Sequence, residues 1–334
     1  MKTYIAIPNG REKEIFITPK IRARIEKLGE VGENKTSQQI TANDVGTIAK
    51  EYDAIIVSWG APCIKKSDLM SKKLKFIGHI GGSVQDVVSE DVFDIDINVV
   101  SGNRGFAKPL AESTLLLMLM GLKRWHVFDS MQKSGVEIEN NERPLTDSLI
   151  GKCVGLLGFG QISREVISLI KPFDVRIMVA DDYITSDEAN KLGVEISNVD
   201  EICEICDVIS IHHTLNESTL HLLNERRINK MKSTALIVNT ARGKIIDQNA
   251  LLKRLEKGEL FAALDVYETP TLAVDHPLRK LDNTILTPHL GGKTMYCHQR
   301  LVEIVIEQLE LFAKGMPLTG RITKDIYCRM TKKF

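Results

Sequence analysis

The sequence has no excess of charge of either sign. Its 334 residues include 44 Lys plus Arg and 44 Asp plus Glu, so the formal net charge is zero. A nucleic-acid-binding protein usually carries a basic excess or a basic block, and neither is found here. We therefore expect no nucleic-acid partner. A small anionic substrate needs only a local positive charge, so a neutral chain leaves small-molecule chemistry open.

Long apolar runs are also lacking. The most apolar run after the N-terminus, 114–122, lies between Glu112 and Lys123 and is far shorter than the ~20 residues that a membrane-spanning helix needs. The apolar stretch near the N-terminus is too short for a signal peptide and is typical of a first strand. These features predict a cytoplasmic protein with no membrane partner.

The cysteines are few and scattered, with six in the whole chain. This distribution is typical of reduced thiols in a cytosolic protein. Cys203 and Cys206 form a CxxC pair, but no second pair of Cys or His follows to complete a zinc site. We therefore expect these two to be small apolar side chains one helical turn apart, and we expect no metal.

What the sequence does contain is an alternation of strand-like and helix-like segments, which predicts parallel sheets. The first α/β unit has expected strands at 4–7, 54–58, 74–79 and 97–100, with helices at 20–27 and 44–51. A polar stretch with two glycines at 101–105 predicts a connection, and one long helix is expected at about 109–128. Six more strands are expected at 152–157, 175–180, 208–211, 234–239, 261–266 and 284–287. Six strands fit a complete doubly wound dinucleotide fold.

A glycine-rich turn follows the expected strand at 152–157. Gly158 permits a tight turn, Gly160 lets a pyrophosphate approach the backbone, and the helix after it starts at Gln161-Ile162. The third glycine of the usual pattern is replaced by Ser163, which is small enough for close packing. The next strand ends at Asp181, where a carboxylate accepts hydrogen bonds from a ribose and repels a 2′-phosphate. This order predicts an NAD site, although a methyl-donor-binding fold can show the same features.

Three later segments carry candidate catalytic groups at strand ends. Arg242 follows one buried strand, Asp265 ends the next, and His289 follows the last. Reduction of a 2-keto acid needs a cation to hold the carboxylate and a proton donor for the new alkoxide. The guanidinium suits the first task by its bidentate geometry, and the imidazole suits the second by its pKa range.

With these residues in view, the sequence resembles the D-isomer-specific 2-hydroxyacid dehydrogenase family, which includes glyoxylate/hydroxypyruvate reductases and phosphoglycerate dehydrogenases. The resemblance extends over 74–82, 111–112, 154–160, 207–212, 239–247, 264–267 and 276–292. It implies an α/β fold of two doubly wound parallel-sheet domains, with a Rossmann NAD-binding domain inserted in a flavodoxin-like substrate domain. The expected boundaries are 1–103 with 294–334 for the substrate domain and 104–293 for the NAD-binding domain. It also implies a homodimer.

The resemblance assigns roles to individual residues. Arg242 matches the substrate-binding arginine, and His289 matches the acid/base. The expected cofactor residues are Gly158, Gly160, Gln161, Ile162, Asp181, His212, Thr240 and Asp265. The expected substrate residues are Gly82 and Ser83, whose backbone N–H groups hold a carboxylate, together with Trp59 and Phe106. His213 is expected to be a surface or packing residue.

The chain departs from the family's pattern at two positions, Pro270 and Phe106. The family pairs its catalytic histidine with a glutamate at the position that Pro270 occupies here, and the nearest acid is Glu268, which we take as its catalytic substitute. If neither Glu268 nor another acid takes the glutamate's place, His289 is expected to lose its proton at lower pH, so that reduction slows toward neutral and alkaline pH. Phe106 stands where many members have asparagine, and either makes the pocket more apolar or packs against the hinge.

Two functions remain open at this point. The first is an NAD-dependent dehydrogenase that transfers a hydride between NAD(H) and a small 2-keto or 2-hydroxy acid, with glyoxylate or hydroxypyruvate favoured. The second is a catalytically weakened NAD-binding protein with a regulatory role. Pro270 supports the second function, whereas the presence of both Arg242 and His289 supports the first.

Overall fold

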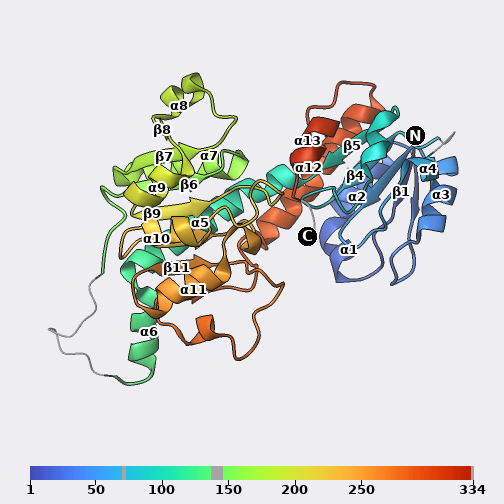
Figure 1. Cartoon of the computed structure of the whole chain (residues 1–334). Coiled ribbons are helices and arrows are strands. Elements are labelled where there is room, and N and C mark those ends of the chain that lie inside the picture. Colours follow the sequence, from blue (N-terminus) through green and yellow to red (C-terminus); the bar gives the residue numbers. More distant parts are fainter. Residues whose placement is uncertain (70–72, 137–145, 332–334) are drawn as a thin grey trace. The chain divides into compact units, whose positions relative to one another are not determined.

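The computed structural model describes residues 1–69, 73–136 and 146–331. Contacts divide the chain into two compact units, shown in Figure 1. Unit 1 comprises Met1–Phe106 and Lys293–Phe334, and unit 2 comprises Ala107–Gly292. The sequence analysis placed the corresponding boundaries after residue 103 and after residue 293.

Unit 1 contains a parallel sheet of five strands. These are β1 (Lys2–Ile5), β2 (Glu30–Glu33), β3 (Ala54–Val57), β4 (Phe76–His79) and β5 (Asn98–Ser101). Their order in the sheet is β2-β1-β3-β4-β5, and every pair is parallel. This is the flavodoxin-like order, in which ligands bind at the carboxyl ends of the strands. The expected flavodoxin-like fold is confirmed, although strand β2 was not predicted.

Helices cover both faces of this sheet. Because side chains alternate along a strand, Ala54 and Ile56 of β3 join one core, whereas Ile55 and Val57 join the other. The first core also receives α1 (Arg11–Phe16), α2 (Pro19–Glu26) and α12 (Met295–Ala313). The second receives α3 (Ala42–Glu51), α4 (Lys66–Leu69) and α13 (Lys324–Arg329).

Unit 2 contains a parallel sheet of seven strands. These are β6 (Cys153–Leu157), β7 (Arg176–Ala180), β8 (Glu195–Ile196), β9 (Val208–Ile211), β10 (Leu236–Asn239), β11 (Phe261–Leu264) and β12 (Thr284–Leu286). The order is β12-β11-β10-β9-β6-β7-β8. From β6 the strands are added outward on one side as β7 and β8, and then on the other side of β6 as β9 to β12. This change of side between β6 and β9 is the arrangement of a dinucleotide-binding Rossmann fold. The expected Rossmann fold is confirmed, with the short edge strand β8 as an addition.

Helices again cover both faces of the second sheet. One core includes α5 (Ala107–Lys123), α7 (Gln161–Ile170) and α8 (Ser186–Leu192). The other includes α9 (Val199–Ile205), α10 (Glu225–Lys230) and α11 (Gln248–Glu256). This two-sided cover explains why the strands read as continuous apolar runs in the sequence.

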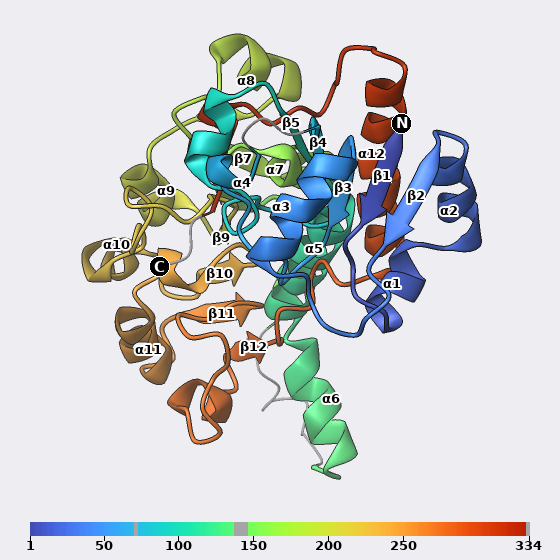
Figure 2. The same ribbon diagram turned by 90° about the vertical axis from the view of Figure 1, so that its right-hand side faces the viewer.

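The prediction of one long helix at 109–128 is wrong. The chain forms two helices, α5 and α6 (Trp125–Lys133), because Arg124 between them adopts a left-handed backbone with φ of 52°. The Arg124 guanidinium lies 4.3 Å from the centre of the Phe261 ring, which holds this residue against the unit. Helix α6 contains no buried residue and extends away from the sheet of unit 2 (Figures 1 and 2).

Among the described residues, one helical stretch, Asn103–Lys123, passes a membrane-span test of length and composition alone, and half of its test window is buried in the protein. Its apolar residues include Ala111, Leu117, Met118 and Leu122, which belong to a core of unit 2. Their side chains therefore pack in the way that a core helix of an α/β domain packs.

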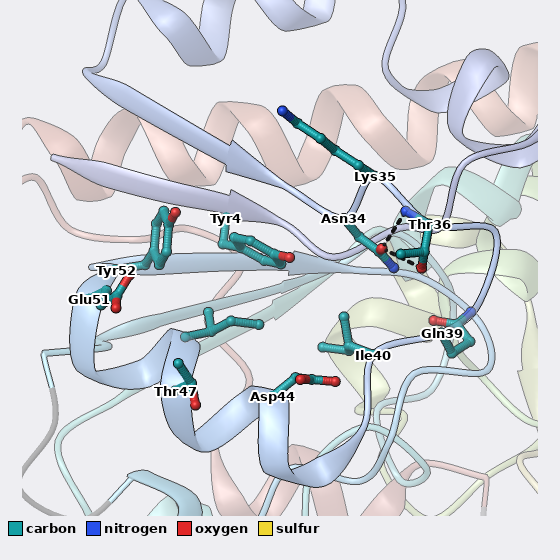
Figure 3. Close-up of a pocket in the computed structure, with 11 residues that line it drawn as sticks. Tyr4, Asn34, Lys35, Thr36, Gln39, Ile40, Asp44, Thr47, Glu51 and Tyr52 are labelled. Carbon is teal, nitrogen blue, oxygen red and sulfur yellow. Dashed lines mark hydrogen bonds between the residues drawn. The ribbon is translucent and has the colours of Figure 1, made fainter.

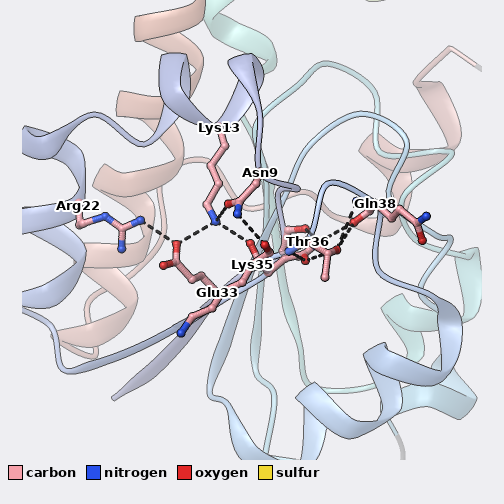
Figure 4. Close-up of polar contacts among 9 residues, drawn as sticks. Asn9, Lys13, Arg22, Glu33, Lys35, Thr36 and Gln38 are labelled. Atoms are coloured by element: carbon pink, nitrogen blue, oxygen red, sulfur yellow. Dashed lines mark hydrogen bonds and ion pairs between the residues drawn. The ribbon is translucent and has the colours of Figure 1, made fainter.

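An ion pair between the buried Lys13 and the partly exposed Glu33 connects the carboxyl ends of β1 and β2 (Figure 4). Lys13 is 7% exposed, and its ammonium donates to the Asn34 carbonyl at 2.7 Å and to Asn9 Oδ1 at 3.0 Å. It also lies 2.9 Å from the Glu33 carboxylate. Hydrogen bonds from Arg22 and Lys13 lower the pKa of Glu33. The loop after β1 is therefore fixed at the edge of the sheet that carries the predicted substrate residues.

Candidate active site

The turn after β6 requires a glycine at its first position. Gly158 has φ of 106°, and a Cβ added there would lie 2.7 Å from the His213 backbone nitrogen. Its own N–H donates to the Ala180 carbonyl at 2.9 Å. Ser163, at the third position of the motif, is fully buried and donates its hydroxyl to the Gly158 carbonyl at 2.6 Å. Ser163 therefore stabilises the turn with a side-chain hydrogen bond that a glycine at this position could not make.

Gly160 serves a different purpose from Gly158. It precedes α7, and a Cβ added there would meet no heavy atom within 4 Å. The space in front of the helix N-terminus is therefore open. Backbone N–H groups and the helix dipole favour an anion at such an end, and a pyrophosphate fits there. Gln161 and Ile162 form the first turn of α7, as expected.

Asp181 follows β7 and is held by two backbone donors. Its Oδ2 accepts from the Phe159 N–H and its Oδ1 from the Tyr183 N–H, both at 2.8 Å. Each carboxylate oxygen can accept a further hydrogen bond, so ribose hydroxyls remain possible donors. The bond to Phe159 joins the acid directly to the glycine turn.

His212 continues from β9 beside the same turn. Its N–H donates to the Leu157 carbonyl at 2.7 Å, and its ring Nε2 lies 2.9 Å from Ser210 Oγ. Burial lowers the pKa of His212 to about 3, so its ring is neutral at physiological pH.

The three candidate catalytic segments meet at one edge of the sheet. In the parallel register, Asn239 of β10 pairs with Leu264 of β11, which pairs with Leu286 of β12. Arg242 lies three residues after the first of these, and His289 lies three residues after the last. The carboxyl edge of unit 2 therefore carries both groups together with the glycine turn.

The loop that holds Arg242 is braced on two sides. Asn239 is fully buried, and its amide donates to the Arg242 carbonyl at 2.9 Å and accepts from the Ala241 N–H at 3.0 Å. A Cβ on Gly243 would overlap the backbone of Tyr267, so this glycine permits the loop to lie against the end of β11. Burial lowers the pKa of Arg242, and its Nη1 donates to the Ala241 carbonyl at 2.7 Å.

Thr240 is the predicted cofactor residue in the same loop. Its side chain is 6% exposed, and its hydroxyl lies 3.1 Å from the Thr114 hydroxyl on α5. The structure therefore places Thr240 between the strand end and the helix.

Asp265 organises the turn that carries His289. It is 1% exposed, and its carboxylate accepts from the Leu290 N–H at 2.8 Å and the Gly291 N–H at 2.9 Å. It also accepts from the Thr287 hydroxyl at 2.5 Å. His289 itself has φ of 54°, donates its N–H to the Asp265 carbonyl at 2.9 Å and has an exposed side chain. The buried acid thus determines where the imidazole is presented.

Glu268 has a partner that the sequence analysis missed. Its Oε1 lies 3.1 Å from His221 Nε2 and accepts from the Gln248 N–H at 3.1 Å. His221 lies 47 positions earlier in the chain, in a loop with no motif, so no local signal pointed to it. Pro270, at the family's glutamate position, is exposed. A pairing of Glu268 with His289 stays a prediction.

The predicted substrate residues in unit 1 lie at the carboxyl edge of its sheet. Trp59 follows β3 and is 42% exposed, with its ring centre 5.8 Å from Phe16 and 6.4 Å from His79. A Cβ added to Gly82, after β4, would lie 3.6 Å from the Phe106 ring. The structure therefore brings Gly82 and Phe106 together within unit 1.

Ser83 lies beside Gly82 in the loop after β4. Its hydroxyl donates to the Thr331 carbonyl at 3.0 Å and accepts from the Gln85 N–H at 3.3 Å. The Ser83 hydroxyl therefore stabilises the loop through these two hydrogen bonds. Binding of a substrate carboxylate by the Ser83 backbone N–H stays a prediction.

A separate hollow in unit 1 contains none of these residues. It measures about 390 Å³ and lies between β1, β2 and α3 (Figure 3). Tyr4 and Tyr52 form one end, with ring centres 5.1 Å apart, and Asn34 and Gln39 contribute to the polar end. The hollow is therefore lined by none of the predicted substrate residues, although Gln39 donates a hydrogen bond to the Trp59 carbonyl at 2.8 Å.

Comparisons with known proteins agree with this arrangement. Residues 115–291, a little over half of the chain, match the family described as D-isomer specific 2-hydroxyacid dehydrogenase, NAD binding domain. A hydroxypyruvate reductase of Thermotoga maritima is 31% identical over 282 residues, which cover 82% of this chain and 90% of the relative. A D-3-phosphoglycerate dehydrogenase of Methanocaldococcus jannaschii is 32% identical over 293 residues, covering 87% of this chain and 55% of the relative.

The solved structures agree on the fold. A glyoxylate reductase from Paecilomyes thermophila superimposes with a TM-score of 0.80 at 22% identity, covering 97% of this chain and 99% of the other. The chain spans about half the length of the first curated relatives it matches. The chain belongs to the D-isomer specific 2-hydroxyacid dehydrogenase family, and unit 2 contains its NAD-binding domain.

Proposed function

We propose that this protein is an NAD-dependent dehydrogenase that transfers a hydride between NAD(H) and a small 2-keto or 2-hydroxy acid of D configuration. The observation that supports it most is the common edge of β10, β11 and β12. It carries a guanidinium, a buried carboxylate and an imidazole beside an open glycine turn.

Each side chain has a distinct task in the reduction of a keto acid. NADH, when bound, supplies the hydride. Arg242 holds the substrate carboxylate and polarises the ketone, and its partial desolvation strengthens that attraction. His289 donates a proton to the carbonyl oxygen, so that hydride and proton together convert the ketone to a hydroxyl. In the reverse direction His289 accepts the proton.

The residues of unit 2 fit the dinucleotide. The open space at Gly160 takes the pyrophosphate, with Gln161 and Ile162 supplying N–H groups of the first helical turn. Asp181 accepts from the adenosine ribose. His212, Thr240 and Asp265 are proposed to bound the rest of the site, the last mainly by fixing the His289 turn.

In unit 1, the backbone N–H groups of Gly82 and Ser83 are proposed to bind the substrate carboxylate. Trp59 and Phe106 are proposed to give an apolar wall to the pocket. An apolar wall suits the short side groups of glyoxylate or hydroxypyruvate better than a phosphate, which requires cations. We therefore favour these two acids as substrates.

A second function has its own supporting observation. The Glu268 carboxylate is bonded to His221 and Gln248, and Pro270 occupies the place of the family's catalytic glutamate. Replacement of that family glutamate by proline slows catalysis more than it weakens NAD binding, because the glutamate serves the acid/base histidine and not the dinucleotide. The alternative is therefore a weakened NAD-binding protein with a regulatory role.

We propose a cytosolic homodimer for the assembled protein. Leu116 on α5 is 56% exposed and Trp125 on α6 is 69% exposed, and we name these two the α5–α6 surface. Large apolar side chains on adjoining helices are typical of a subunit interface. All six cysteines are free thiols, which suits a reducing compartment.

The function is tested by mixing the protein with NADH and either glyoxylate or hydroxypyruvate and following NADH absorbance. We expect consumption of NADH with formation of the 2-hydroxy acid. Tight NADH binding without consumption, for any of a panel of 2-keto acids, would favour the regulatory alternative.

A further inference from the structure

The hollow between β1, β2 and α3 in unit 1 has no task in the proposed reaction. Its volume of about 390 Å³ is within the range of small-molecule sites in proteins. Gly32 of β2 contributes to its shape, because a Cβ added there would overlap the Tyr52 hydroxyl. The Tyr52 ring therefore lies against β2, and the Tyr4 ring meets it edge to face at an angle of 65°.

The two phenol rings form the aromatic part of the hollow. Neither hydroxyl has a hydrogen-bond partner among the described residues, so both can bond to a ligand. Burial raises the pKa of Tyr4, and Tyr52, Asp44 and Glu33 act in the same direction. Negative charge is therefore placed beside an aromatic ring, and both features attract an organic cation.

Helix α3 supplies two carboxylates to the hollow, from Asp44 and Glu51. Seven positions separate them, so they share one face of the helix and lie about 10 Å apart along its axis. Figure 3 shows Thr47 between them on the same side of α3. Hydrogen bonds from the Thr41 backbone and hydroxyl lower the pKa of Asp44, which is therefore ionised at neutral pH.

The lysines near these two carboxylates do not neutralise them. Lys2 pairs with Glu30 at 2.6 Å, and the Lys73 ammonium lies 3.4 Å from the Asp53 carboxylate. Lys35 lines the hollow, but its chain extends away from the tyrosines in Figure 3. Within the described part of the chain, both carboxylates of α3 therefore border the hollow without an ion-pair partner.

We propose that this hollow is a binding site for a small linear diamine in its diammonium form. One ammonium pairs with Asp44 and the other with Glu51, and the methylene chain lies against the rings of Tyr4 and Tyr52. A chain of about four or five methylene groups spans the ~10 Å between the two carboxylates. This inference concerns binding alone, and it does not depend on the proposed reduction of a keto acid.

Isothermal titration calorimetry with putrescine (1,4-diaminobutane) tests the site directly. We expect putrescine to bind about fivefold more tightly than n-butylamine, which has a single ammonium and so makes one exposed ion pair fewer. 1,4-Butanediol has a similar length and no charge, and it should not bind measurably. Added salt should weaken the binding of putrescine, because both ion pairs are exposed to solvent.

Conservative substitutions locate the ligand. Glu51→Gln should lower putrescine affinity about fivefold, to that of n-butylamine, and adding Asp44→Asn should lower it further. Glu26→Gln is the matched control, since it removes the same charge from an exposed position of α2 outside the hollow and should leave the affinity unchanged. Thermal unfolding shows whether each variant folds. Should Glu51→Gln fail to fold, Asp44→Asn alone takes its place.

Three results would overturn the proposal. One is a wild-type protein that binds no putrescine, and another is equal affinity for putrescine and n-butylamine. The third is a loss of affinity in Glu26→Gln as large as that in Glu51→Gln, which would show a general attraction of cations to the surface. Loss of keto acid reduction with intact putrescine binding would contradict only the dehydrogenase function.

Discussion

At the scale of single residues, the two glycines of the cofactor turn have opposite structural requirements. Gly158 has a positive φ and is packed against the His213 backbone, whereas the space beside Gly160 is open. The sequence motif contains both glycines, but it does not show that Gly158 is required by the fold whereas Gly160 is required by the ligand.

This difference predicts distinct outcomes for the two alanine variants. Gly160→Ala should unfold at the wild-type temperature but bind NADH at least tenfold more weakly, because its methyl group fills the pyrophosphate space. Gly158→Ala should lose about 2 kcal/mol of stability or more, through left-handed strain and overlap. Thermal unfolding with NADH titration measures both effects. Equal NADH affinity of Gly160→Ala and wild type would contradict the cofactor placement.

A buried histidine in unit 1 makes stability depend on pH. His79 is 1% exposed, and burial lowers its pKa to about 4. Above the unfolded value of ~6.5 it is neutral in both states and has no effect. As the pH falls, the unfolded chain takes up the proton first, so the free energy of unfolding decreases, by about 2 kcal/mol at pH ~5.

His79→Gln should remove this decrease. Denaturant unfolding of the two proteins at pH ~7.5 and ~5 compares the losses directly. The glutamine variant is expected to lose about 2 kcal/mol less on acidification than the wild type. Parallel losses in both proteins would show that other groups cause the acid sensitivity.

At the scale of elements, the sequence predicted the buried strands well and the exposed ones poorly. The prediction of β9 at 208–211 agrees with the structure, because continuous apolar residues distinguish a buried parallel strand. Strand β2 has the sequence Glu-Val-Gly-Glu and β8 has two exposed residues, so neither carries that signal. The helix break at Arg124 was missed since it involves neither glycine nor proline.

The candidate site divides in the same way. Strand ends that carry Arg242, Asp265 and His289 were predictable, because the ends of parallel strands share one edge. Contacts between segments that are distant in the sequence could not be predicted. Examples are the pairing of Glu268 with His221 and the hydrogen bonds of Asp265 to the His289 turn. The sequence contained the residues but no information on their partners.

At the scale of the whole molecule, the α5–α6 surface predicts assembly. Trp125→Glu should convert the expected dimer to a monomer, because a carboxylate buried at an interface is strongly disfavoured. The fold should survive, since α6 contains no buried residue. Size-exclusion chromatography with light scattering gives the mass. A monomeric wild type, or a variant that stays dimeric, would contradict the proposed interface.

The account as a whole depends on His289 acting on a substrate held by Arg242. The most direct test is the rate of NADH oxidation with the preferred keto acid, measured for the wild type and for His289→Gln. We expect the rate constant to fall on the order of 100- to 1000-fold in the variant, with NADH affinity unchanged. A variant that reduces the keto acid as fast as the wild type would contradict the assignment of the imidazole as proton donor, and with it the proposed mechanism.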